Sequence, residues 1–151
     1  MPKLDLSSIP LTNATGYPPE QAKAVEGRWY RRLAPEGGLT DFGASHVVLK
    51  PGAWSSQRHW HEDEDEMVIM LSGEAVLIDD TGRTPMMPGD VAIFPKNDGN
   101  GHHLVNESES DCIFVALGRA AEGVCHYSDI DMRYKAGEGY TRRDGSPVAA
   151  E

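Results

Sequence analysis

Short hydrophobic runs that alternate with polar residues dominate the chain between residues 44 and 127. Alternation of period two is typical of β-strands with one buried face, and Gly, Pro, Asn and Asp between the runs are typical of turns. The pattern predicts strands at 45–49, 55–61, 66–71, 74–78, 84–87, 91–94, 102–106, 112–117 and 124–127. About eight or nine short strands at this spacing indicate an all-β sandwich or barrel.

The two ends of the chain lack this alternation. Residues 1–43 contain repeated prolines that interrupt any long element, and only residues 20–28 favour a short helical turn. Residues 128–151 are polar and rich in glycine. We therefore expect a single barrel domain at 44–127, with an irregular N-terminal arm (1–43) packed on it and a polar C-terminal tail (128–151).

The predicted strand at 66–71 is apolar on both faces. Val68 and Met70 alternate with Met67, Ile69 and Leu71. One face must line the barrel, so the other needs a cover, either the N-terminal arm or a second subunit. The pattern by itself leaves both covers open.

Composition and charge narrow the class of protein. The 151 residues include 24 acidic and 14 basic side chains, for a net charge of −10, which disfavours nucleic acid and anionic membranes as partners. No apolar run approaches the ~20 residues of a membrane span, and the N-terminus lacks the pattern of a signal peptide. Cys112 and Cys125 have no CxxC spacing and are expected to be reduced, buried thiols, with a disulfide between them as the alternative. These features favour a cytoplasmic protein with a small-molecule ligand.

The segment His59-Trp60-His61 carries the strongest chemical signal. On an extended strand, side chains one residue apart point to the same face, so the two histidines can reach one point while Trp60 faces away. Glu66 follows His61 with four residues between them, and a second histidine pair stands at 102–103. Imidazole and carboxylate are ligands of first-row divalent metals, so the sequence predicts a metal site on a β scaffold.

The spacing of these residues resembles the two sequence motifs of the cupin superfamily. The first motif is matched by Gly52, His59-x-His61, Glu66 and Gly73, with one extra residue between the first glycine and histidine. The second is matched by Gly89, Pro95, Gly99, His102 and Asn106, with three residues instead of one between Pro95 and Gly99. The stretch 58–106 and the segment 139–145 look like a group of small bacterial single-domain cupins.

The resemblance implies a cupin double-stranded β-helix, a jelly-roll barrel with a metal inside. Because cupins of this type commonly dimerise through such sheets, it also implies a homodimer that covers the outer face of the strand at 66–71. The implied ligands are His59, His61, Glu66 and His102, and the ion would be iron, manganese, nickel, zinc or copper. His103 competes with His102, but the motif spacing and the strand alternation favour His102. Asn106 would either orient a ligand or cap its strand.

Several nearby residues are expected to have structural or surface roles and not to bind the metal or the substrate. The acidic run at 62–65 is expected to be a solvated turn. Trp60 and Arg58 should point outward, and His46 and His126 are expected to be structural or surface residues.

The predicted function is binding of a divalent metal and a small, oxygen-rich organic molecule. As an enzyme, the protein would be a metal-dependent dioxygenase, isomerase or lyase in which Glu66 detaches to act as a base. The alternative is a non-catalytic cupin that binds or senses a small molecule. The complete ligand set favours metal chemistry, although the fold alone does not define a reaction.

Overall fold

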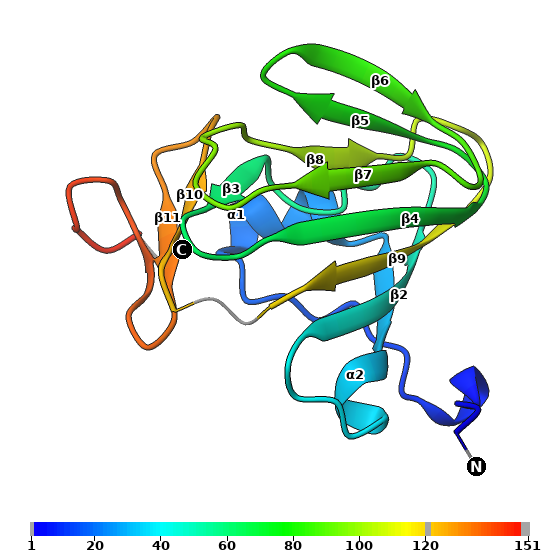
Figure 1. The fold of residues 1–151 in the computed structure, drawn as a ribbon. Coiled ribbons are helices and arrows are strands. Elements are labelled where there is room, and N and C mark those ends of the chain that lie inside the picture. Colours follow the sequence, from blue (N-terminus) through cyan, green and yellow to red (C-terminus); the bar gives the residue numbers. More distant parts are fainter. Residues whose placement is uncertain (1, 120–121, 149–151) are drawn as a thin grey trace.

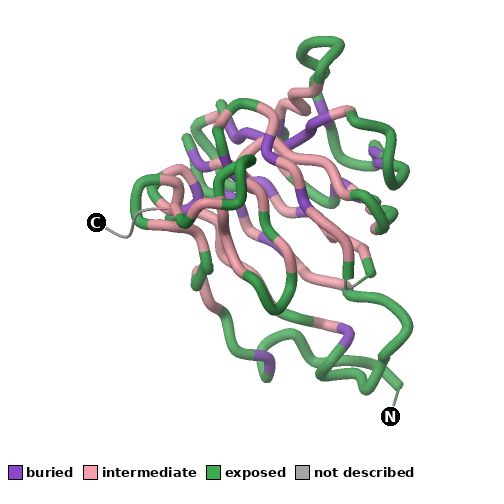
Figure 2. Tube along the Cα trace, turned by 90° about the vertical axis from the view of Figure 1, so that its left-hand side faces the viewer, coloured by how far each residue is buried: buried purple, intermediate pink, exposed green. Residues whose placement is uncertain are grey.

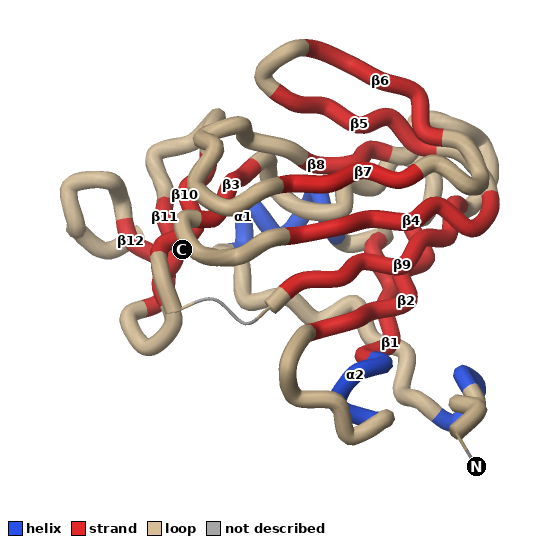
Figure 3. Tube along the Cα trace, viewed as in Figure 1, coloured by secondary structure: helices blue, strands red, loops and turns tan. Residues whose placement is uncertain are grey.

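The computed structural model describes residues 2–119 and 122–148. Figures 1 and 3 show a barrel of antiparallel strands with a few short helical segments at its lower and rear sides. The helical segments are η1 (Leu6–Ser8), α1 (Pro19–Ala22), η2 (Lys23–Val25) and α2 (Leu33–Glu36). Among the described residues, no helix is long and apolar enough to cross a membrane.

The strands form three antiparallel sheets. The largest sheet has the order β1-β2-β9-β4-β7, from β1 (Arg28–Arg32), β2 (Gly43–Leu49), β9 (Cys112–Gly118), β4 (Glu66–Ser72) and β7 (Val91–Phe94). The second has the order β12-β11-β10-β3, from β12 (Gly139–Thr141), β11 (Arg133–Lys135), β10 (Val124–Tyr127) and β3 (His59–His61). The third has the order β6-β5-β8, from β6 (Gly82–Met86), β5 (Ala75–Asp79) and β8 (His103–Val105). The prediction of an all-β architecture is confirmed.

The hydrophobic core lies between the large sheet and the strands that face it. Alternating residues of the large sheet, such as Val47, Val68, Met70 and Phe114, point inward and are buried. Leu104 of β8 packs against them from the opposite wall. Figure 2 shows how the buried positions alternate with exposed ones along the strands.

Three strands lie outside the segments with clear alternation. β1 is the edge strand of the large sheet and pairs with β2 from Arg28↔Leu49 to Arg32↔Ser45. Its sequence, Arg-Trp-Tyr-Arg-Arg, has no apolar face, so the period-two signal is absent. β11 and β12 extend the β3–β10 sheet within the segment expected to be a polar tail. Their contribution to the core is small, through Tyr140 and its neighbours Met132 and Tyr127.

Strand β3 is shorter than predicted. It begins at His59, whereas the sequence pattern indicates a start at 55. The preceding residues form a loop, in which the Ser55 carbonyl accepts a hydrogen bond from Arg28 and the Ser56 carbonyl lies 2.9 Å from His103 Nδ1. The Ser55 N–H also donates to the Leu104 carbonyl, so this backbone bond and the side-chain contacts hold the loop where a continuous strand ladder was expected.

Candidate metal centre

The four predicted ligands come from three neighbouring elements. His59 and His61 lie on β3, Glu66 is the first residue of β4, and His102 immediately precedes β8. His102 is joined to His59 by an isolated β-bridge, which holds the two histidines side by side. Trp60 faces away and stacks on His126, with ring centroids 4.3 Å apart. The alternation along β3 is therefore as predicted.

Three imidazole rings converge on one carboxylate oxygen. Glu66 Oε1 lies 3.0 Å from His102 Nε2, 3.3 Å from His61 Nε2 and 3.6 Å from His59 Nε2. His102 is held flat against Phe94, with ring centroids 3.6 Å apart. Candidate ligand atoms group as His59–Glu66–His102 and as His61–Glu64–Glu66, each within 4.8 Å. Glu66 belongs to both of these groups, and its Oε1 is the atom on which the three rings converge.

The second nitrogen of two rings faces a backbone carbonyl. His59 Nδ1 lies 2.8 Å from the Gln57 oxygen, and His102 Nδ1 lies 3.3 Å from the Asn100 oxygen. A carbonyl oxygen only accepts, so Nδ1 must carry the hydrogen and Nε2 of a neutral ring presents its lone pair. Metal-binding histidines in proteins are commonly oriented in this way.

In this arrangement the Nε2 atoms, which are hydrogen-bond acceptors in the neutral rings, face the Glu66 carboxylate, which is also an acceptor. Neutral Nε2 atoms facing a carboxylate at 3.0–3.6 Å repel one another unless a cation or protons lie among them. Burial lowers the pKa of His59, which opposes its protonation. Burial opposes the ionisation of Glu66, but the three imidazoles outweigh it and hold the Glu66 pKa well below its usual range. The donor set of imidazoles and an ionised carboxylate therefore fits a divalent metal.

Two further residues of the cluster were not anticipated from the sequence. Glu64 was expected in a solvated turn, but its side chain is only 16% exposed and Oε2 lies 3.4 Å from His61 Nδ1. Burial, with the charge of Glu66 adding to it, raises the Glu64 pKa to about 7. Gly118 leaves room for it, since a Cβ there would collide with Glu64 Oε1. The expectation of a solvated turn is therefore wrong for Glu64.

Cys125 is the second addition. Its strand β10 pairs with β3 in the register Cys125↔His61, and its sulfur forms a possible ligand group with His59 and His61. Burial opposes the charge on His61, but Cys125 and Glu66 together raise its pKa to about 11. No motif in the sequence links this cysteine to the histidines.

The contacts of His102 and His103 differ, and only His102 lies against Glu66. His103 is also buried, but its ring meets Trp54 edge-on at 4.8 Å and its Nδ1 faces Ser56. Asn106 closes a turn: its Nδ2 donates to the carbonyls of Leu49 and Ser110. Of the two roles left open for Asn106, the structure favours the cap.

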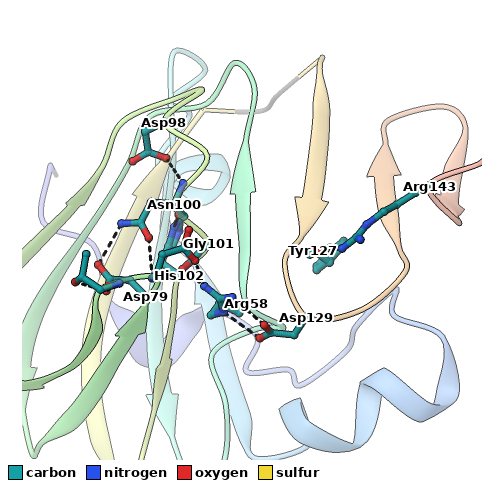
Figure 4. A network of polar contacts seen from close by, with 11 residues as sticks. Arg58, Asp79, Asp98, Asn100, Gly101, His102, Tyr127, Asp129 and Arg143 are labelled. Carbon is teal, nitrogen blue, oxygen red and sulfur yellow. Dashed lines mark hydrogen bonds and ion pairs between the residues drawn. The ribbon is translucent and has the colours of Figure 1, made fainter.

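A polar network holds the loop that carries His102 (Figure 4). Arg58 donates to the Gly101 carbonyl and pairs with Asp129 and Asp80, and these carboxylates raise its pKa. Asn100 bonds to Asp79 through its Nδ2. Arg58 therefore points away from the cluster, as predicted, but it anchors the loop behind the cluster.

A cavity of about 730 Å³ adjoins the cluster. His59, Glu66 and His102 line it, together with Glu64 and His103. The volume lies within the ~300–1,000 Å³ of typical small-molecule sites. An antiparallel barrel with histidines and carboxylates at the wall of such a cavity is the architecture of a small-molecule-binding jelly roll.

Comparison with known proteins identifies the family. Residues 45–118 match the model of the cupin domain. The crystal structure of a sugar phosphate isomerase from a cupin superfamily, from Silicibacter pomeroyi, shares 44% identity, with 99% of this chain and 98% of that chain covered and a TM-score of 0.92. The chain belongs to the cupin superfamily, and the predicted cupin fold is confirmed.

Two other structures support the fold. A Cupin 2 conserved barrel domain protein from Salinispora arenicola shares 27% identity over 80% of this chain and 88% of its own, with a TM-score of 0.57. A protein from Acidithiobacillus ferrooxidans shares 23% identity over 83% of this chain and 84% of its own, with a TM-score of 0.71. A search of curated proteins gives no match. Cupins commonly bind a metal, and the clusters around Glu66 are candidate ligand groups.

Proposed function

We propose that this protein is a metal-dependent isomerase of a small sugar phosphate, with a divalent ion held by His59, His61, Glu66 and His102. The observation that carries the proposal is the convergence of three imidazole Nε2 atoms on one ionised carboxylate oxygen beside a ligand-sized cavity. Iron, manganese, nickel, zinc and copper all accept such nitrogen and oxygen donors.

The relative from S. pomeroyi supports an isomerase over the other reactions that cupins perform. It is described as a sugar phosphate isomerase, and it aligns with nearly the whole of this chain at 44% identity. A dioxygenase, a lyase and a non-catalytic binding protein are the competing functions. The experiment described below distinguishes the isomerase from the dioxygenase and from the binding protein.

Sugar isomerisation moves a proton between adjacent carbons beside a carbonyl group. When bound, a divalent ion supplies Lewis acidity that polarises the sugar oxygens. A carboxylate of the chain must accept the proton and return it. Glu66 is one candidate base, but it must first leave three imidazole contacts. Glu64 is the other candidate base. It also lines the cavity, and it contacts one imidazole, that of His61.

The test combines metal analysis with a direct assay. We expect about one divalent ion per chain in the isolated protein. Glucose 6-phosphate and ribose 5-phosphate incubated in D₂O and followed by NMR should show conversion to the ketose and deuterium exchange at the carbon beside the carbonyl. Oxygen uptake instead of exchange would indicate a dioxygenase. Metal and ligand binding with no conversion of any sugar phosphate would indicate a binding protein.

We also propose a homodimer formed by the outer face of β4 and β7. Met67 pairs with Ile93 across the two strands and Ile69 pairs with Val91. Ile93 is 65% exposed and Val91 54% exposed. The N-terminal arm contacts the other edge of the sheet, where Thr12 bridges Tyr30. An apolar face of this kind is covered when it meets the same face of a second copy.

Sedimentation at micromolar concentration should give about twice the chain mass of 16.5 kDa. Ile93→Lys should give a monomer, because it places a charge in the centre of the apolar face. Leu39→Lys is the matched control, since Leu39 is 50% exposed but lies on the loop after α2. A wild-type monomer at high concentration would contradict the proposal.

Both cysteines are buried free thiols, Cys112 on β9 and Cys125 on β10. Reduced thiols are typical of a reducing compartment. We therefore propose that the protein is cytoplasmic.

A further inference from the structure

The cavity has a second polar end, formed by strand β1. Arg28, Tyr30 and Arg32 all line the cavity, because alternate residues of a strand share one face. Arg31 lies on the opposite face, where its Nε donates to the Ile9 carbonyl. Arg119, directly after β9, also lines the cavity. Two guanidinium groups of β1 therefore line the cavity, whereas Arg119 lines it beside Gly118, which pairs with Glu66 of β4.

Arg28 reaches across the barrel interior. Its Nη1 donates to the Ser55 carbonyl at 2.9 Å, and its Cζ lies 5.4 Å from the centre of the Tyr30 ring. These contacts fix the guanidinium in one orientation. Its Nε is buried and has no hydrogen-bond partner within the described part of the chain. A buried donor without a partner is costly, and a bound acceptor would satisfy it.

The charges of Arg28 and Arg32 are not neutralised by protein carboxylates. Among residues 2–119 and 122–148, no carboxylate oxygen lies within 4.0 Å of either guanidinium. Arg58 and Arg83, by contrast, are each paired with acidic side chains. Unneutralised arginines facing a cavity stand out in a chain with a net charge of −10. Their chemistry suits an anionic ligand group, above all a phosphate, which a guanidinium binds through two hydrogen bonds.

The two ends of the cavity are separated across the large sheet. Strands β2 and β9 lie between β1 and β4, so the backbones of β1 and β4 are about 14 Å apart along the sheet. The carboxylates Glu64 and Glu66 lie at the β4 end, and Arg28 and Arg32 lie on β1 at the other end. A ligand with a phosphate at one end and hydroxyl or carbonyl oxygens at the other matches this separation of charge.

We propose that Arg28 and Arg32 bind the phosphate group of the substrate and so select phosphorylated sugars over neutral ones. The inference rests on the proposed function for the placement of the sugar near Glu66. The anion site itself depends only on the arginines. The two can therefore fail separately.

The experiment measures binding by isothermal titration calorimetry to the full chain as purified. The probes are glucose 6-phosphate, ribose 5-phosphate, the parent sugars glucose and ribose, and the carboxylate gluconate. Variants Arg28→Gln and Arg32→Gln should each weaken binding of a sugar phosphate roughly tenfold or more, because each removes charge-assisted hydrogen bonds. Binding of the parent sugars should change less than about twofold.

Arg31→Gln is the matched control. It removes the same charge from the same strand, but its side chain lies outside the cavity, so sugar phosphate binding should be unchanged. Arg32 is exposed at the end of β1, so Arg32→Gln tests the proposal even where loss of the Ser55 contact prevents Arg28→Gln from folding. Metal content is measured in every variant and should remain that of the wild type.

The outcomes separate the two proposals. Arginine-dependent binding of a sugar phosphate to a chain that binds no metal would support the anion site and contradict the proposed metal enzyme. Wild-type affinity in both Arg28→Gln and Arg32→Gln would overturn the anion site even in an active isomerase. Equal affinity for gluconate, or no preference for either sugar phosphate over its parent sugar, would overturn the proposed selection for a phosphate group.

Discussion

Replacement of His102 by alanine is expected to abolish stoichiometric metal binding. His102 Nε2 makes the shortest contact with Glu66, at 3.0 Å, and its ring is held by Phe94 and by the Asn100 carbonyl. Loss of a partner behind a ligand commonly costs about 10–100-fold in metal affinity, so loss of a ligand should cost roughly a hundredfold or more. Metal content after dialysis and competitive titration with a chelator measure the effect.

His103→Ala is the matched control. His103 is as deeply buried as His102 and adjacent in the chain, but it contacts Trp54 and Ser56 instead of Glu66. It should therefore lose stability without losing the metal, which thermal unfolding and metal content report separately. Equal loss of metal from both variants would mean that His102 is not the ligand.

Replacement of Glu64 by glutamine is expected to keep the metal and remove most of the isomerase turnover. Glutamine preserves the size of the side chain beside His61 but cannot accept a proton. Loss of a general base typically lowers turnover about 10²–10⁴-fold. The measurement is the rate of deuterium exchange into the sugar phosphate, with metal content determined on the same sample.

Glu66→Gln provides the contrast. Glu66 is surrounded by three imidazoles, so this variant should lose the metal together with the activity. Glu62→Gln is a control for the charge change, because Glu62 is 42% exposed and pairs with His126 outside the cavity. Full turnover in Glu64→Gln would exclude Glu64 and leave Glu66 as the proposed base.

Part of the site could be predicted from the sequence because the patterns that indicate it involve residues close together in the chain. Alternation along an extended strand is sufficient to send His59 and His61 to one side and Trp60 to the other. The apolar runs predicted most strands between 44 and 127, since side chains with a period of two can bury one face only in a sheet. The motif spacing singled out His102 over its neighbour, and the contacts with Glu66 agree.

The rest of the site depends on which segments meet, and no local pattern specifies this. Cys125 lies beside His61 because β10 pairs with β3, and Glu64 turns inward because β9 places Gly118 next to it. Arg28 and Arg32 face the cavity because a strand without an apolar face joins the edge of the large sheet. Register between distant segments is decided by the packing of the whole core, so these residues became part of a site only in the tertiary structure.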